Sequence, residues 1–126
     1  LRSRFERGRG GHYVKTRAPR VEIADSSFDD SQGRATNYMV DLSNGATGTI
    51  ARNAFVQGRN KENYSALIFV GPEGETNSSD GLAIVDNEAT LAPGADATTF
   101  VADRSGGELR IENNRLGSQI ARYARR

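Results

Sequence analysis

The chain has 126 residues, enough for one domain with a modest core and too few for two. It contains no cysteine, which excludes a disulfide framework, a thiolate metal site and a cysteine nucleophile. The net charge of +1 conceals basic ends and an acidic middle, because residues 1–20 sum to +6, residues 21–109 to −9 and residues 110–126 to +4. No run of eighteen apolar residues occurs, so we predict no membrane span.

We expect the chain to open inside a repeat. Ser3 and Phe5 occupy the polar and apolar positions of a short template whose aliphatic anchor would precede residue 1. We therefore expect a truncated first repeat, in a fragment or processed form of a longer chain. A short apolar run, HYVKTR, follows at residues 12–17.

Four full copies of the template follow, each with an aliphatic anchor, a small polar residue three positions later and an apolar residue two positions beyond that. The anchors, spaced 27, 34 and 27 residues apart, are Ile23, Ile50, Ile84 and Ile111. The small polar residues are Ser26, Asn53, Asn87 and Asn114. Further apolar runs lie between the anchors, at residues 37–42, 64–70 and 98–103.

Each anchor lies in period-two alternation, which is typical of a short, half-buried strand. The linkers, such as SNGATG at residues 43–48, are rich in turn-forming residues, and helical periodicity is lacking. One repeat is therefore predicted to be strand, turn, short strand, loop, strand, loop. Such a unit buries its apolar face only when successive copies stack.

This pattern resembles the right-handed parallel β-helix of the pectate lyase-like superfamily, over essentially the whole chain. The resemblance implies an all-β fold, a β-solenoid of about four to five coils forming a single domain over residues 1–126. It also implies a structural ladder at the turns, in which each side-chain amide bonds the equivalent group one coil away. The members of that ladder would be Ser26, Asn53, Asn87 and Asn114. Four separate turns in an antiparallel sandwich are the alternative.

Many members of that superfamily cleave or epimerise acidic polysaccharides, using Lys or Arg as base and carboxylates that hold calcium. The corresponding candidates here are His12, Lys15 and Arg17 for substrate binding, with Lys15, Arg17 and Asp41 as a catalytic set. In an extended chain Lys15 and Arg17 point one way and His12 the other. The alternative interpretation is that these long basic side chains are simply solvated on the outside of a strand. His12 is the only histidine, so no histidine metal cluster is available.

Two weaker signals concern other ligands. The segment RGRGG at residues 7–11 is similar to nucleic-acid-binding segments, but a single copy favours a glycine-rich turn, and we do not expect a nucleic-acid partner. Acidic clusters at Asp29 and Asp30 and at residues 86–88 leave Ca²⁺ open as a cofactor, although neither has the order of a known calcium loop. We predict no metal site and no other cofactor.

Two functions of different class remain. The first is a non-catalytic structural module that self-associates or forms part of a larger assembly, with copies of itself or the rest of a longer β-helix chain as partners. The second is a polysaccharide lyase or carbohydrate-binding module for acidic, uronate-containing polysaccharides. Either function leads us to expect a secreted, periplasmic or cell-surface location.

Overall fold

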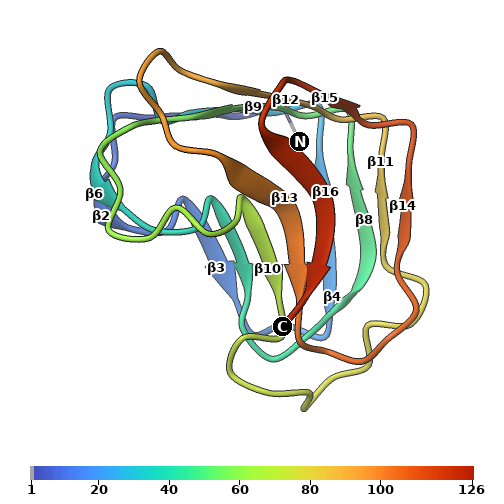
Figure 1. The fold of residues 1–126 in the computed structure, drawn as a ribbon. Helices are drawn as coiled ribbons and strands as arrows, with labels where there is room; N and C mark the ends of the chain where they lie inside the picture. Colours follow the sequence, from blue (N-terminus) through green and yellow to red (C-terminus); the bar gives the residue numbers. More distant parts are fainter. Residues whose placement is uncertain (1) are drawn as a thin grey trace.

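A computed structural model describes residues 2–126 of the chain. In that range it contains sixteen strands joined by turns and loops, and every strand pairing is parallel. Consecutive strands lie in different sheets, so the chain winds round an axis and returns to each sheet once per coil (Figure 1). The predicted all-β parallel solenoid is confirmed, and the antiparallel alternative is wrong.

Three long sheets form the walls of the solenoid. Sheet A contains β1 (Arg4–Glu6), β5 (Ser27–Asp29), β9 (Ala54–Gln57), β12 (Glu88–Leu91) and β15 (Arg115–Leu116). Sheet C contains β3 (Val14–Thr16), β7 (Val40–Leu42), β10 (Ile68–Val70), β13 (Thr98–Asp103) and β16 (Ile120–Arg125). Sheet D contains β4 (Arg20–Ala24), β8 (Thr47–Ala51), β11 (Ala83–Val85) and β14 (Arg110–Glu112).

A small fourth sheet, sheet B, lies between sheets A and C along the chain. It pairs β2 (Arg9–Gly11) with β6 (Arg34–Thr36), and a single bridge from Thr36 to Lys61 continues it into the third coil. Figure 1 places these strands at the left edge of the molecule.

The register follows the sequence repeat. The four anchor isoleucines lie directly beside one another in sheet D, although one of their spacings is longer than the other two. Most of the extra length lies in the loop at residues 71–81, between β10 and β11. The insertion therefore leaves the stacking of the strands unchanged.

Columns of like side chains fill the interior. Phe28 is fully buried between Phe5 and Phe55, and both of its ring neighbours lie 4.8 Å away between centroids, nearly parallel to it. This separation equals the usual spacing of neighbouring strands, because each ring comes from the next strand of sheet A. Phe5, from the first strand of sheet A, is partly buried and packs against the core.

Candidate functional site

The turn between sheets D and A carries a ladder of side chains, which we call the asparagine ladder: Ser26, Asn53, Asn87 and Asn114. The backbone N–H of each ladder residue donates to the side-chain Oδ1 of the next one. The three hydrogen bonds are 3.0 Å from Ser26 to Asn53, 2.9 Å from Asn53 to Asn87 and 2.9 Å from Asn87 to Asn114. The amide nitrogens of Asn53 and Asn87 also donate to the next Oδ1 along the stack. Each coil is thereby tied to the next at its sharpest bend.

The residue before each ladder position adopts a left-handed conformation. Asp25, Arg52, Asp86 and Asn113 all have φ between 55° and 59°. A non-glycine residue pays roughly 1–2 kcal/mol for this conformation. Each ladder asparagine also donates its amide to the carbonyl of the anchor isoleucine of a preceding coil, for example Asn87 to Ile50 over 2.9 Å. These buried hydrogen bonds offset the strain of the turn.

The outer face of sheet C brings together three of the residues predicted to bind substrate or catalyse. Lys15 lies directly beside Asp41 in the register of β3 and β7. Nε2 of His12 is 3.1 Å from Oδ2 of Asp41, and Nζ of Lys15 is 4.0 Å from the same oxygen. Asp41 is almost fully buried and also accepts a hydrogen bond from the Ser43 hydroxyl.

The predicted orientation of His12 is wrong. His12 and Lys15 both reach Asp41, although strict alternation would place them on opposite faces. Alternation fails because β3 begins only at Val14, and residues 12 and 13 form a bend before it. In the bend, Nδ1 of His12 faces the carbonyl oxygen of Tyr38 at 3.1 Å and its ring stacks on Tyr38.

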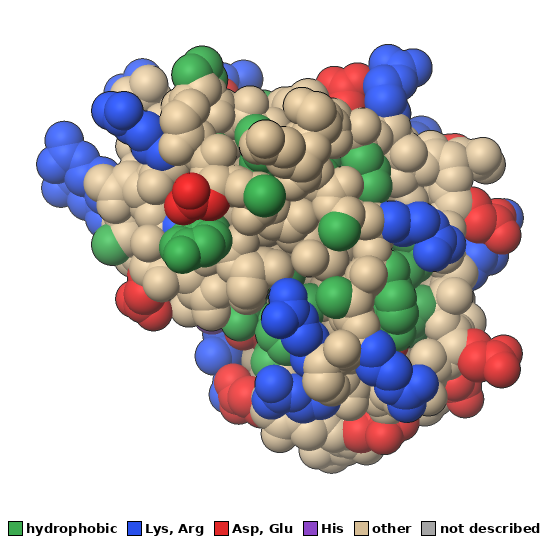
Figure 2. Space-filling view, in the orientation of Figure 1, with side chains coloured by type: hydrophobic (Ala, Val, Ile, Leu, Met, Phe, Trp, Pro, Cys, Tyr) green, Lys and Arg blue, Asp and Glu red, His purple; other side chains and the backbone are tan. Residues whose placement is uncertain are grey.

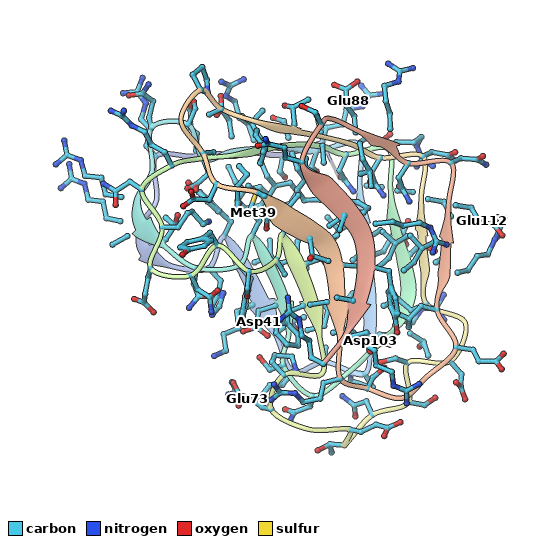
Figure 3. The ribbon with its side chains drawn as sticks, viewed as in Figure 1. Met39, Asp41, Glu73, Glu88, Asp103 and Glu112 are labelled. Carbon is cyan, nitrogen blue, oxygen red and sulfur yellow. The ribbon has the colours of Figure 1, made fainter. Side chains whose placement is uncertain are left out.

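Arg17 does not join Asp41 and instead binds Glu73, a residue that the sequence reasoning missed. Nη2 of Arg17 is 2.6 Å and Nζ of Lys15 is 3.1 Å from the Glu73 carboxylate. These two hydrogen-bonded cations hold the pKa of Glu73 below its usual range. Glu73 comes from the 71–81 loop, and Figure 3 shows it at the lower edge of the molecule beyond Asp41. The sequence feature that could have indicated Glu73 is its position in the longest insertion between the apolar runs.

The cluster of His12, Lys15, Arg17, Asp41 and Glu73 therefore pairs its basic groups with carboxylates of the same chain. A lyase of the kind implied by the resemblance needs a basic side chain aimed at substrate and carboxylates open to a cation. Here the Asp41 carboxylate is enclosed, and Lys15 and Arg17 hold Glu73. Among residues 2–126, no three acidic or histidine side chains are arranged to hold a metal ion.

A buried ion pair lies where sheets A and B meet, between Asp30 and Lys61. Nζ of Lys61 is 3.1 Å from Oδ2 of Asp30, and both side chains are at most 1% exposed. Asp30 also accepts hydrogen bonds from the hydroxyls of Tyr13 (2.7 Å) and Thr36 (2.8 Å). Burial lowers the pKa of Lys61 and raises that of Tyr13. In the sequence, Asp30 was recognisable only as half of an acidic cluster with Asp29.

At the C-terminal end, Tyr123 and Ser105 hold the buried carboxylate of Asp103. The Tyr123 hydroxyl donates to Oδ2 over 2.7 Å and the Ser105 hydroxyl to Oδ1 over 2.6 Å. Partial burial, together with the Asp103 bond, raises the pKa of Tyr123 to about 12.

This shift predicts a loss of stability in alkali. Below pH 10, the ordinary tyrosine value, the contribution of Tyr123 is complete, and it disappears as the pH rises towards about 12, where the folded-state group ionises. The lowered pKa of Lys61 changes the pH dependence of stability in the opposite sense. The contribution of Tyr123 is therefore measured as the difference between the wild type and a variant that lacks its hydroxyl. Urea unfolding at several pH values should show a steeper loss above pH 10 for the wild type than for Tyr123→Phe. Parallel curves would contradict the prediction.

The two ends of the solenoid leave strand edges without partners among the described residues. At one end β1, β3 and β4 each pair on a single side, and at the other β14, β15 and β16 do so. Apolar side chains on these end strands or beside them are only partly buried: Phe5, Val14 and Ile23 at the first end, and Leu109, Leu116 and Ile120 at the second. Each end therefore presents both unpaired backbone groups and apolar surface.

Comparisons with protein-family models, with curated proteins and with solved structures found no match to this chain. Among the described residues there is also no helix long and apolar enough to cross a membrane.

Proposed function

We propose that this protein is a structural β-solenoid module that builds a larger assembly through its open ends. The observation that carries this proposal is the pair of unpaired sheet edges with apolar side chains beside them. An unpaired edge is a template for another strand, and solenoids in general need covered end repeats to remain soluble. The partner is a second copy or another β-solenoid segment, in an extracellular or surface setting.

Charge opposes direct stacking of two copies at low salt. Residues 1–20 and 110–126 carry +6 and +4, and these segments form most of the two ends. Raising the ionic strength to about 1 M shortens the Debye length to about 3 Å and should promote end-to-end association. The charge pattern thus predicts assembly that salt strengthens.

The test is sedimentation and electron microscopy of the native material across a concentration and salt series. Val14→Lys and Ile120→Lys place a charge at one end each, whereas Tyr64→Lys changes an exposed aromatic residue in the middle coil and serves as the control. We expect large species for the wild type and for the control, and small ones for the two end variants. Circular dichroism verifies that each variant is folded. A wild type that remains monomeric throughout would contradict the proposal.

Binding or cleavage of acidic polysaccharide is the second candidate, and it is favoured by the approach of His12 and Lys15 to Asp41. In this alternative the uronate carboxylate replaces Glu73 as the partner of Lys15. Release of unsaturated uronate products, lost in Lys15→Ala, would support it. Association that is unaffected by Lys15→Ala, together with an absence of such products, would support the structural module.

A further inference from the structure

A dipeptide, Gly-Arg, recurs at an interval of 25 residues in the first three coils, outside the template that defines the solenoid. Its copies are Gly8-Arg9, Gly33-Arg34 and Gly58-Arg59. Arg9 lies directly beside Arg34 in the pairing of β2 with β6, and the bridge from Thr36 to Lys61 carries the same register towards Arg59. We call these three residues the arginine ladder. Neighbouring rungs of such a ladder are about 4.8 Å apart at the backbone.

The core fixes the position of this ladder. A side chain at Gly33 would bring its Cβ to 2.0 Å from Oδ1 of Asp30, and one at Gly58 would come equally close to the Asp30 carbonyl oxygen. The chain therefore passes directly over the buried Asp30 and Lys61 pair, and only glycine allows so close an approach. The arginine that follows each glycine is exposed. Figure 2 shows basic side chains projecting at this left edge of the molecule.

The charge of the ladder is not compensated by the described part of the chain. None of its three arginines forms an ion pair with a carboxylate there. Arginines elsewhere on the turns do, since Arg52 binds Asp25 and Arg115 binds Glu88. Like charges directly opposite in a sheet are destabilising. The fold therefore maintains an unfavourable array of charge at this edge, which an anion would relieve.

A hollow between the first two rungs has the shape and chemistry to take that anion. It has a volume of about 170 Å³ and is lined by Arg7, Arg9, Gln32 and Arg34. One water occupies about 30 Å³ of liquid, so a group of several heavy atoms fits. Arg7 has a left-handed backbone, with φ of 57°, and its side chain only just reaches Glu6, at 4.0 Å. Three arginines and a glutamine thus line one small volume.

We propose that Arg7, Arg9 and Arg34 form a binding site for a phosphate group, with Arg59 as a further rung for a second phosphate. Three cations around one hollow match a group with about two negative charges and three acceptor oxygens better than a carboxylate with one charge and two oxygens. Guanidinium binds such oxygens in pairs, which a lysine in the same place could not do. The site is built on β2 and β6 of sheet B rather than on the unpaired edges of β1, β3 and β4, and Arg7 and Arg9 belong to the basic segment of the first end.

Calorimetric titration of the purified chain tests the site with four probes: inorganic phosphate, pyrophosphate, phosphoserine and acetate, at matched ionic strength. We expect the phosphates to bind and acetate not to bind. Tighter binding of inorganic phosphate or pyrophosphate identifies a free phosphate as the source, and tighter binding of phosphoserine identifies a phosphate carried by a larger molecule. Binding of acetate as tight as that of phosphate would overturn the proposal, as would no binding of any phosphate.

Variants locate the site. Arg9→Gln combined with Arg34→Gln should weaken phosphate binding by about tenfold or more. Arg59→Gln should weaken pyrophosphate while leaving inorganic phosphate unchanged. Arg20→Gln, an exposed arginine of β4 that forms no ion pair with any of residues 2–126, is the control. An equal loss in Arg20→Gln would indicate general attraction to a basic surface and would overturn the assignment.

The melting temperature shows whether each of these variants is folded. Because the ladder arginines are exposed, replacing them removes no core contact. Removing the two facing positive charges of Arg9 and Arg34 should leave the melting temperature in low-salt buffer unchanged or raise it. Phosphate should raise the melting temperature of the wild type and not that of the double variant. A melting temperature that rises equally in both would contradict a specific site.

Discussion

Replacing Lys61 with methionine is expected to lower the free energy of unfolding by about 3–5 kcal/mol, because the substitution leaves the Asp30 carboxylate buried without its counter-ion. Asp30 is fully buried, and the remaining donors from Tyr13 and Thr36 carry no full charge. Methionine preserves most of the volume of the lysine stem, so the loss measures charge rather than packing. Equilibrium unfolding in urea, followed by circular dichroism, gives the value.

The partner substitution and the double variant complete this measurement. Asp30→Asn keeps the shape of the side chain and should cost a similar amount, since Lys61 is then the uncompensated charge. The double variant should be far more stable than the sum of the two losses predicts, because it leaves neither charge unpaired. Additive losses would show that the pair contributes no coupling, contrary to its separation of 3.1 Å.

Replacing Asn87 with alanine is expected to cost about 3 kcal/mol, since several buried polar groups lose their partners at once. The backbone N–H and the amide of Asn53 both donate to Oδ1 of Asn87, and the Asn87 amide donates to the Ile50 carbonyl. All of these groups lie in the buried part of the ladder. The free energy of unfolding, measured as for Lys61, tests the value.

Serine at position 87 provides the matched comparison. Ser26 already occupies a ladder position, where its hydroxyl accepts from the N–H of Ser3 and donates to the carbonyl of Ala24. A serine at position 87 can therefore still accept from Asn53, and Asn87→Ser should lose less stability than Asn87→Ala. Equal losses would mean that packing, rather than hydrogen bonding, decides the cost.

The regular part of this fold could be read from the sequence, and the reason is physical. A stacked solenoid repeats the same environment in each coil, so the isoleucine anchors and the residues three positions after them recur visibly. The structure places those anchors side by side in sheet D and the small polar residues one above another. The same template placed Phe5 at the apolar position that Phe28 occupies one coil later, and Phe5 lies beside Phe28.

The candidate site was harder to predict from the sequence because several of its residues come from irregular segments. His12 reaches Asp41 through a bend that alternation does not describe, and Glu73 comes from a loop that is longer than the corresponding loops of the other coils. Lys61 and Asp30 lie far apart in the sequence, so no local sequence pattern predicts that they form a pair. The Gly-Arg repeat was visible in the sequence, but its interval of 25 residues differs from that of the anchors, and only the register of β2 and β6 aligns two of its copies.

Uniformly parallel strand pairing gives the solenoid a direction. Since β1, β3 and β4 bound one end and β14, β15 and β16 the other, the two ends are different surfaces. Copies joined by strand pairing from end to end would all face the same way, and that kind of contact does not close on itself. The resulting polymer would be polar, with one tip always exposing the first coil and the other the last. Growth could then differ between the tips, and a single capping molecule could arrest one of them alone.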